Sequence, residues 1–251
     1  MKRFAKGIIP ISIILALWII GSQHVNPLFL PRVSSVYKSF KLLLANGMLM
    51  KGIGISFYRI TIATLLSGAV SLPIGLLVYH FKVLDDMITP ITGFMRYMPI
   101  TAFYPLLIMW LGIEEKMKIC FLFLATFFYF LPSVILSLKE TSTELVDTAL
   151  TLGYSRFKTL CLVVLPSSLP NILKTYLMMY GIGWTYVVLA EETNARYGLG
   201  YIINVSSARG RTDMVFVALL MILTLSYLID HLGDHLIKKA FKWKYARRVE
   251  D

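Results

Sequence analysis

The sequence predicts an all-α, polytopic membrane protein with about six transmembrane helices, and three observations support this fold class. First, 57% of the 251 residues are hydrophobic and 16% are charged, whereas about a quarter of the residues of soluble domains are charged. Second, the mean hydropathy is +0.70. Third, the apolar residues gather in runs close to the roughly 20 residues that a helix needs to cross the hydrocarbon of a bilayer.

Six apolar segments are the predicted spans: residues 7–21, 55–79, 88–111, 117–138, 172–190 and 214–233. The first is short, contains Pro10 and follows the basic residues Lys2, Arg3 and Lys6. A secretory signal peptide has the same order of basic and apolar regions, but no small-x-small cleavage site follows here. We therefore favour an uncleaved first span over a signal peptide.

The second span carries small residues at a regular spacing. Ser67, Ser71 and Gly75 recur every four residues, so they lie on one face of a helix. Small residues on one face let two helix backbones approach closely in a membrane. This stripe predicts close packing against another helix.

The third span, residues 88–111, contains Pro90, Pro99 and Pro105. Prolines leave backbone carbonyls unpaired, which hydrocarbon cannot satisfy, so this segment is expected to pack within protein or to line a wet cavity. Arg96 lies in the same segment, where a charge is costly unless it faces protein or water. Three interpretations of Arg96 stay open: it reaches the cytoplasmic interface, it pairs with a helix terminus, or it contacts an anion in a pathway.

The distribution of basic residues predicts the orientation. About fourteen lysines and arginines near span ends lie on the side of the N terminus and about nine on the other, and the run from Lys238 to Arg248 supplies most of the excess. Both termini are therefore predicted to be cytoplasmic. The net charge of +11 suits anionic lipid headgroups better than nucleic acid, because the basic residues flank apolar runs.

The connection over residues 139–171 is long and partly polar, unlike the other connections. Leu145, Ala149 and Leu152 share one stripe at helical spacing, and Gly153 follows them. A glycine suits the left-handed residue that ends many helices. We predict a short amphipathic helix outside the membrane that stops at Gly153.

A second short helix is predicted after this turn, from Ser155 to Val164, with Ser155 as its N-cap. Pro166 and Pro170, each after a leucine, are predicted to end it, because the residue before a proline disfavours helix. Periodicity leaves two interpretations of the loop open. It rests on lipid headgroups as an interfacial hairpin, or it docks a cytoplasmic partner.

Six residues of this loop have a distinctive spacing: Asp147, Thr148 and Ala149, then Gly153, then Leu165 and Pro166. This order resembles the EAA loop of ABC importer permeases, in which an acidic-Ala-Ala triplet precedes a glycine and later a Leu-Pro pair. The resemblance favours the docking interpretation, with Asp147 in the first turn of the docking helix. The chain departs from the usual pattern by having Asp147 in place of glutamate, Thr148 in place of alanine and Leu150 in place of a basic residue.

Further stretches extend the resemblance to the branch that serves nitrate, sulfonates, taurine and bicarbonate: residues 26–31, 96–99, 105–112, 151–156 and 197–203. The resemblance implies the type I ABC importer permease fold, with residues 1–251 as a single transmembrane domain and residues 139–171 as its cytoplasmic coupling loop. It also implies a multi-pass protein of a bacterial or archaeal inner membrane. The chain itself then catalyses no reaction.

The partners follow from the same resemblance. They are a second copy of this permease, two cytoplasmic ABC ATPase subunits and an extracytoplasmic solute-binding protein. The chain contains no GxxxxGK[ST] motif, so ATP and Mg are expected on the ATPase and no cofactor on this chain.

Six residues are candidates for the translocation pathway: Arg96, Pro99, Trp184, Tyr186, Glu191 and Glu192. The acidic pair closes the fifth span after an apolar run, so at least one of the two is expected to face inward, as a gate or as a tie between helices. Trp184 and Tyr186 are more typical of core packing than of solute contact. An anion is the favoured solute, such as a sulfonate, nitrate or bicarbonate, with a vitamin precursor as the alternative.

Basic residues underlie the preference for an anion, namely Arg96, Arg196, Arg209 and Arg211. The last three also suit docking of an acidic binding protein. A secondary transporter or channel is the alternative function, although no internal repeat favours it. His231 and His235 have the i, i+4 spacing of a metal pair, but no third ligand is evident, so a polar helix end is favoured and no metal site is predicted.

Overall fold

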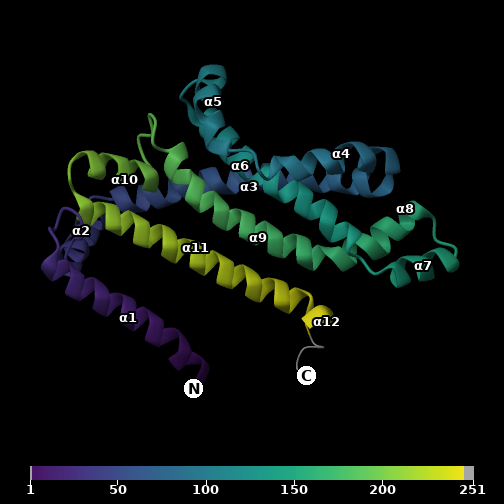
Figure 1. Ribbon diagram of the computed structural model, residues 1–251, viewed down its shortest axis with the longest axis horizontal. Helices are drawn as coiled ribbons and strands as arrows, with labels where there is room; N and C mark the ends of the chain where they lie inside the picture. The colour runs from purple at the N-terminus through teal and green to yellow at the C-terminus, as the bar shows by residue number, and fades with distance from the viewer. Residues whose placement is uncertain (1, 246–251) are drawn as a thin grey trace. The chain divides into compact units, whose positions relative to one another are not determined.

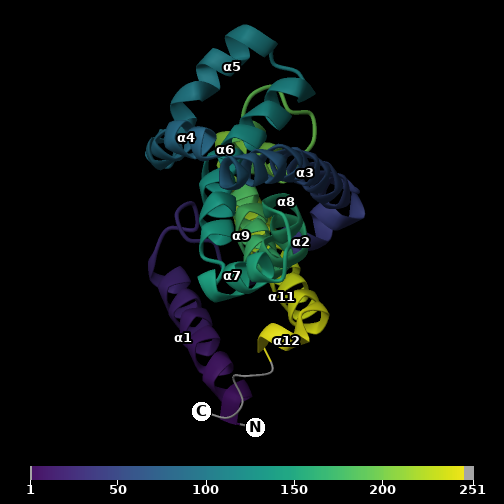
Figure 2. The same cartoon turned by 90° about the vertical axis from the view of Figure 1, so that its right-hand side faces the viewer.

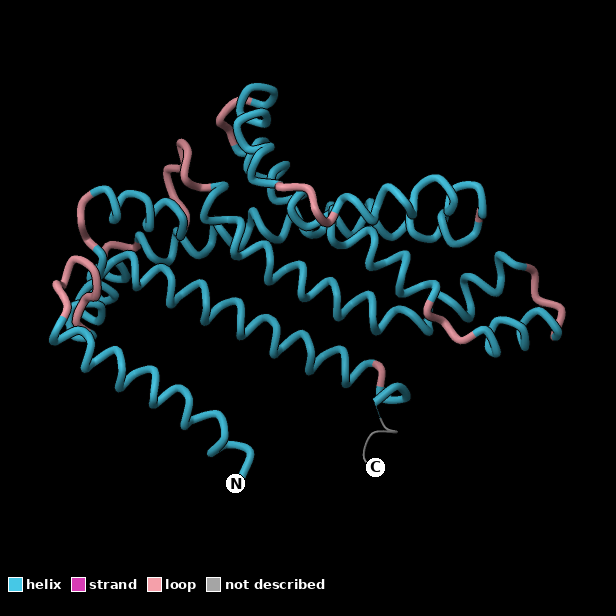
Figure 3. Tube along the Cα trace, in the orientation of Figure 1, coloured by secondary structure: helices cyan, strands magenta, loops and turns pink. Residues whose placement is uncertain are grey.

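The computed structural model describes residues 2–245, with only the backbone for residues 2–8 and 11. Lys2, Arg3 and Lys6 therefore have no described side chains, and Arg247 and Arg248 lie outside the described residues. Within residues 2–245 every regular element is a helix, which confirms the all-α class (Figures 1 and 3).

The elements are α1 (Lys2–His24), α2 (Val33–Ala45), α3 (Met48–His80), α4 (Lys82–Met95), a 3₁₀ turn (Ile100–Phe103), α5 (Tyr104–Leu111), α6 (Glu115–Lys139), α7 (Thr143–Thr151), α8 (Arg156–Thr159), a π-helical turn (Leu160–Val164), α9 (Leu165–Ala190), α10 (Leu199–Ala208), α11 (Thr212–Ala240) and α12 (Lys242–Tyr245).

Four helices of the described chain are long and apolar enough to cross a membrane: Met48–His80, Glu115–Lys139, Arg156–Ala190 and Thr212–Ala240. A bent pair, Lys82–Met95 with Ile100–Leu111, makes a fifth if it counts as one span. Ser12–His24 in α1 is a shorter apolar helix. Each predicted span thus has a helical counterpart, and the count of about six is approximate.

The predicted third span, residues 88–111, is interrupted, because α4 and the helical segment Ile100–Leu111 are bent by 91° relative to each other. Pro99 lies at the break, with φ −73° and ψ 92°. A proline lacks the N–H that would continue the helix, and it forces the preceding residue toward an extended conformation. Pro105 lies in the first turn of α5, where the missing N–H has no helical partner in any case.

The predicted proline stop after Val164 is also wrong. The chain stays helical from Arg156 to Ala190, through the π-helical turn Leu160–Val164 and past Pro166 and Pro170 (Figure 3). The π-helical turn shifts the hydrogen-bond register by one residue just before the start of α9, and Pro166 lies at the second position of α9, where a missing N–H costs least. Residues 156–171 therefore extend the fifth span instead of belonging to a loop.

The chain divides into two compact units, one of residues 1–57 with 191–224 and the other of residues 58–190 with 225–251. The assignment of one transmembrane domain to residues 1–251 stays a prediction. In the second unit α6 packs along α9, as both ribbon views show (Figures 1 and 2). Their core cluster comprises Phe130, Val134, Leu138, Leu160, Val164, Ile172 and Met179.

Glycines allow the helices of this unit to approach closely. A Cβ atom at Gly75 of α3 would lie 2.6 Å from Val134 Cγ1 of α6, and one at Gly183 of α9 would lie 2.8 Å from Ile60 Cγ2 of α3. Ser67 and Ser71 are buried on the same helix as Gly75. The predicted small-residue packing stripe is confirmed.

Candidate functional site

The predicted coupling loop forms a hairpin of α7 and α8. Gly153 has φ +83°, and the backbone N–H groups of Gly153 and Tyr154 donate to the carbonyls of Leu150 and Ala149 at 3.0 and 3.1 Å. This pair of bonds satisfies the last carbonyls of a helix that ends in a left-handed residue. The predicted glycine stop is therefore confirmed.

The second arm of the hairpin begins at the predicted cap. The Ser155 hydroxyl accepts a hydrogen bond from the Lys158 N–H at 3.3 Å. Such a bond satisfies one of the N–H groups that have no partner within a helix at its start. Because the helix then continues to Ala190, the turn at Gly153 is joined directly to a membrane span.

The stripe predicted on α7 is divided between two environments. Ala149 is buried, and the neighbouring Val146 packs against the core cluster. Leu145 and Leu152 are 50% and 73% exposed. The hairpin is thus held to α6 and α9 by one face, while apolar side chains of the other face are available to a partner.

Asp147 does not occupy the first turn of the helix, contrary to the prediction. α7 begins at Thr143, and the acidic residue of its first turn is Glu144. Asp147 is exposed in the second turn, and its carbonyl accepts from the Thr151 hydroxyl at 2.9 Å. Because the helix dipole acts mainly within the first turn, Asp147 gains little from it.

The remaining residues of the motif lie on the helices themselves. Thr148 is exposed, and its hydroxyl donates to the Glu144 carbonyl at 2.6 Å. Leu165 packs against the core cluster, whereas Pro166 is exposed at the start of α9. The Leu-Pro pair therefore belongs to the base of the long helix and not to a loop.

Glu191 is fully buried in the first unit, which confirms that one member of the acidic pair faces inward. Its Oε1 atom accepts from the Ser56 hydroxyl at 2.8 Å, and its Oε2 atom accepts from the Gly200 N–H at 2.8 Å. The Ser56 hydroxyl in turn accepts from the Leu199 N–H at 2.9 Å. The carboxylate thus ties α3 to the first turn of α10, where a negative charge is favourable.

A glycine is required at position 198, directly before α10 and beside the Glu191 carboxylate. Its φ is +144°, and a Cβ atom there would lie 2.1 Å from Glu191 Oε2. Glu192, by contrast, is exposed, and its carbonyl accepts from the Asn204 side-chain amide at 2.8 Å. The two adjacent glutamates therefore have different surroundings.

The other pathway candidates lie in the second unit. Arg96 and Pro99 are exposed at the bend after α4, and Arg96 lines a cavity of about 360 Å³ together with Thr92 and Lys139. Trp184 is buried in α9, and the Tyr186 ring makes an edge contact with Phe121 at 6.0 Å between centroids. The burial of Trp184 favours packing over contact with a solute.

Arg59, in the second predicted span, forms an ion pair with Glu115 that was not predicted from the sequence. Arg59 is 2% exposed, and its Nε and Nη2 atoms donate to Glu115 Oε2 and Oε1 at 2.7 and 2.5 Å. Arg59 is the one charged residue within residues 55–79. A charge in a span should face protein or a partner, so the sequence held the signal that would have identified it.

The family described as "Binding-protein-dependent transport system inner membrane component" matches residues 69–242 of this chain, which is more than half of its length. The chain belongs to this family. As a member, it is the membrane-spanning permease component of an ABC importer, a multi-pass protein that translocates and does not catalyse. The alternative of a secondary transporter or channel is therefore wrong.

Relatives of this permease cover nearly its whole length. The "Putative ABC transporter permease protein" of Methanocaldococcus jannaschii is 32% identical over 87% of this chain and 84% of its own length. The "Putative aliphatic sulfonates transport permease protein SsuC" of Bacillus subtilis is 29% identical over 97% and 90%. The "Taurine transport system permease protein TauC" of Escherichia coli is 29% identical over 91% and 86%.

A solved structure supports the fold of this permease. A chain of the MetNI methionine ABC transporter, solved in inward-facing conformations, superposes with a TM-score of 0.68 at 20% identity. The match covers 76% of this chain and 95% of that chain. The expected type I importer permease fold is therefore confirmed.

Proposed function

We propose that this permease translocates a small sulfonate that an extracytoplasmic binding protein delivers, and that its α7–α8 hairpin couples transport to a cytoplasmic ABC ATPase. The names of two relatives, for aliphatic sulfonates and for taurine, support this class of solute. Both kinds of solute carry a tetrahedral, negatively charged sulfonate group, which taurine combines with an ammonium group. The exposed guanidinium of Arg96 beside a cavity suits such a charge.

The observation that carries the coupling proposal is the continuity of the hairpin with a span. The hairpin has one face on the core and exposed apolar side chains, Leu145 and Leu152, on the other. Its second arm continues without a break into the 35-residue helix Arg156–Ala190. Movement of an ATPase bound to α7 is then passed to the membrane span as movement of a rigid element.

The assembly that we propose is a homodimer of permeases with two ATPase subunits, which hold ATP and Mg, in an inner membrane. Both termini are cytoplasmic in this arrangement, on the same side as the hairpin. Maleimide labelling of single cysteines introduced at Lys158 and Glu192 tests the orientation, because an impermeant reagent should reach only Glu192→Cys from outside. Mass measurement of the purified complex tests the stoichiometry.

Reconstitution tests the solute class directly. The permease is placed in proteoliposomes with its ATPase and binding protein, and ATP hydrolysis is measured with taurine, an alkanesulfonate, nitrate or bicarbonate. We expect stimulation by the sulfonates. Stimulation by nitrate or bicarbonate alone would refute the solute class and leave the coupling proposal standing, whereas failure of the ATPase to bind the permease would refute the coupling proposal.

A further inference from the structure

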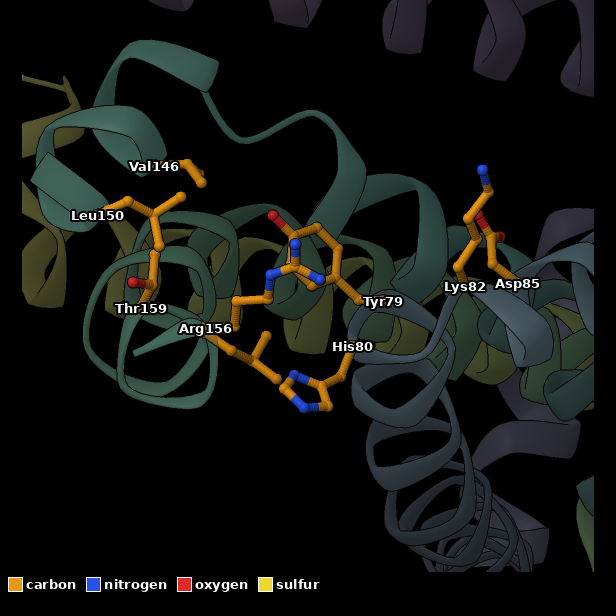
Figure 4. A pocket seen from close by; sticks show the side chains of 9 residues that line it. Tyr79, His80, Lys82, Asp85, Val146, Leu150, Arg156 and Thr159 are labelled. Carbon is orange, nitrogen blue, oxygen red and sulfur yellow. The ribbon is translucent and has the colours of Figure 1, made fainter. Parts of the chain in front are cut away.

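The cavities of the described chain differ in whether their side chains converge on one ligand. In the cavity of about 440 Å³ beside the α7–α8 hairpin, Lys82 and Asp85 line one end, and Val146 and Thr159 line the other (Figure 4). A compact ligand there does not contact both ends. Two cavities in the first unit are arranged differently, because one is polar, the other is apolar, and they adjoin each other.

The apolar cavity is a groove of about 220 Å³ between α1, α2 and the first turns of α11. One face of α2 forms a wall of it, with the i, i+3, i+4 and i+7 spacing of a helical stripe: Val33, Val36, Tyr37 and Phe40. The rest of its lining is Trp18 of α1 and Val217, Leu220 and Met221 of α11. Tyr37 and Leu220 are 57% and 40% exposed, so the groove opens at the surface.

The side chain of Trp18 fixes the walls of this groove relative to one another. Its Nε1 atom donates to the Pro31 carbonyl at 3.0 Å, and its ring lies 5.4 Å from the Phe216 ring between centroids. These contacts join α1 both to the chain just before α2 and to α11. The groove is therefore formed by three packed segments of the first unit and not by the face of one helix.

The polar cavity, of about 430 Å³, lies where α1 ends and α2 begins. Its lining comprises Ile19, Ser22, Gln23, Arg32, Val33 and Ser34. Val33 also lines the apolar groove, and Ile19 directly follows Trp18 of the groove. The two cavities therefore adjoin along both α1 and α2.

Arg32 gives the polar cavity a positive charge. Its side chain is exposed, and no other described side chain forms an ion pair with it. The described residues that line the cavity include no carboxylate. The Gln23 amide and the Ser34 hydroxyl are further hydrogen-bond donors in the same lining. A guanidinium with neutral donors beside it suits the oxygens of a phosphate group.

The order of the two cavities along the helices matches the order of headgroup and acyl chain in a phospholipid. The polar cavity includes Ser22 and Gln23, at the end of the apolar helix Ser12–His24. The groove reaches residues 217–221, which lie roughly 8–13 Å along α11 from its start at Thr212. Aromatic residues such as Trp18 and Tyr37 are typical of the level where headgroups meet acyl chains.

We propose that the two cavities together bind one anionic phospholipid, with its phosphate beside Arg32 and one acyl chain in the groove. The adjoining apolar groove favours a lipid over a free phosphate ion, and the charge of Arg32 favours a headgroup of net negative charge. The bound lipid fills the space between α1, α2 and α11. This proposal concerns the permease alone and does not depend on the solute or on docking of the ATPase.

Native mass spectrometry of the purified full chain in detergent tests the proposal, because it counts the lipids that each chain binds. The probes are dioleoyl-phosphatidylglycerol, its phosphatidylcholine counterpart and glycerol phosphate, which has the charge without the acyl chains. We expect the first phosphatidylglycerol to bind about tenfold more tightly than the first phosphatidylcholine. Equal binding of the two lipids would overturn the proposal. Binding of glycerol phosphate as tight as that of phosphatidylglycerol would reveal a site for a free anion and would also overturn it.

A pair of charge substitutions locates the phosphate. Arg32→Gln should weaken binding of phosphatidylglycerol to the level of phosphatidylcholine, because it removes the cation of the polar cavity. The matched control is Lys38→Gln, which removes an equal charge from an exposed position of α2 that lines neither cavity. An equal loss of affinity in both variants would show general attraction instead of a site.

A pair of tryptophan substitutions locates the acyl chain. Leu220→Trp fills the groove and should weaken binding of phosphatidylglycerol severalfold. Leu219→Trp is the control, since Leu219 and Leu220 are 42% and 40% exposed and only Leu220 lines the groove. Val33→Phe provides the same test from α2 should Leu220→Trp fail to fold. Unchanged affinity in the groove variants would exclude the acyl chain from the groove. A changed mass of the assembled permease, with lipid affinity unchanged, would assign the groove to a second copy of the chain and overturn the proposal.

Discussion

The hydroxyl of Ser56 donates to the buried carboxylate of Glu191 at 2.8 Å and accepts from the Leu199 N–H at 2.9 Å. One serine thus holds both the carboxylate and the start of α10. The carboxylate completes the arrangement by accepting from the Gly200 N–H. A single small side chain therefore links residues that are about 140 positions apart in the sequence.

We predict that Ser56→Ala lowers the stability of the permease by about 1–3 kcal/mol, because it leaves a buried N–H and part of a buried carboxylate without a partner. Ser71→Ala is the matched control on the same helix, since Ser71 is equally buried but its hydroxyl has no partner in the described chain. Thermal or chemical unfolding in detergent measures both. Equal effects would mean that burial, and not the link to Glu191, determines the loss.

The contact between Gly75 and Val134 predicts a compensating pair of substitutions. Gly75→Ala places a Cβ atom 2.6 Å from Val134 Cγ1, and such overpacking costs about 1–3 kcal/mol. Val134→Ala removes the methyl groups that clash. The double variant should therefore be more stable than the sum of the two single changes predicts. Unfolding measurements on the parent, the two single variants and the double variant form a double-mutant cycle that tests this. Simple additivity would contradict close packing of α3 on α6.

The left-handed turn at Gly153 predicts a defect in coupling without a defect in folding. A Cβ atom there meets no other atom within 4 Å, so Gly153→Val is strained only by its φ of +83°. The strain should redirect α7, and sulfonate-stimulated ATP hydrolysis should fall while membrane insertion is normal. Gly54→Ala is the control, at a helical glycine with equal space and no positive φ. Normal stimulation in Gly153→Val would remove the turn from the coupling mechanism.

We predict that Asp147 makes a salt-dependent contribution to docking of the ATPase. Because this residue lies in the second turn of α7, its contribution comes from contact with the partner and not from the helix dipole. Asp147→Ala should weaken binding by about 1 kcal/mol or less, with a greater effect at low salt, and Asp147→Glu should retain binding. Titration of the solubilised permease with its ATPase at two ionic strengths measures this. Equal damage from both substitutions would exclude Asp147 from the docking surface.

Hydropathy and spacing were sufficient to predict the spans and the glycine turn. The apolar runs correspond to α3, α6 and α11, and Gly153 has the positive φ that its position after a helix requires. These features depend on the chemistry of neighbouring residues, which the sequence contains. The family was identified by resemblance, from the motif between Asp147 and Pro166 and from further stretches such as residues 96–99 and 197–203.

Prolines were the main source of error, because their effect depends on the surrounding hydrogen bonds. Pro99 breaks a helix, whereas Pro166 and Pro170 lie within one that continues. A π-helical turn precedes Pro166, and such a turn has no sequence pattern of its own. The partners of Glu191 were likewise unpredictable, since Ser56 is distant in the sequence and only the fold brings it near.

The helical run Arg156–Ala190 is not one straight rod. Its 35 residues change direction between α8 and α9, where the π-helical turn Leu160–Val164 lies, as the trace in Figure 3 shows. Helices commonly bend at a single turn of π-helix. The α7–α8 hairpin therefore lies at an angle to α9 instead of extending it in a straight line, while the helix between them stays continuous.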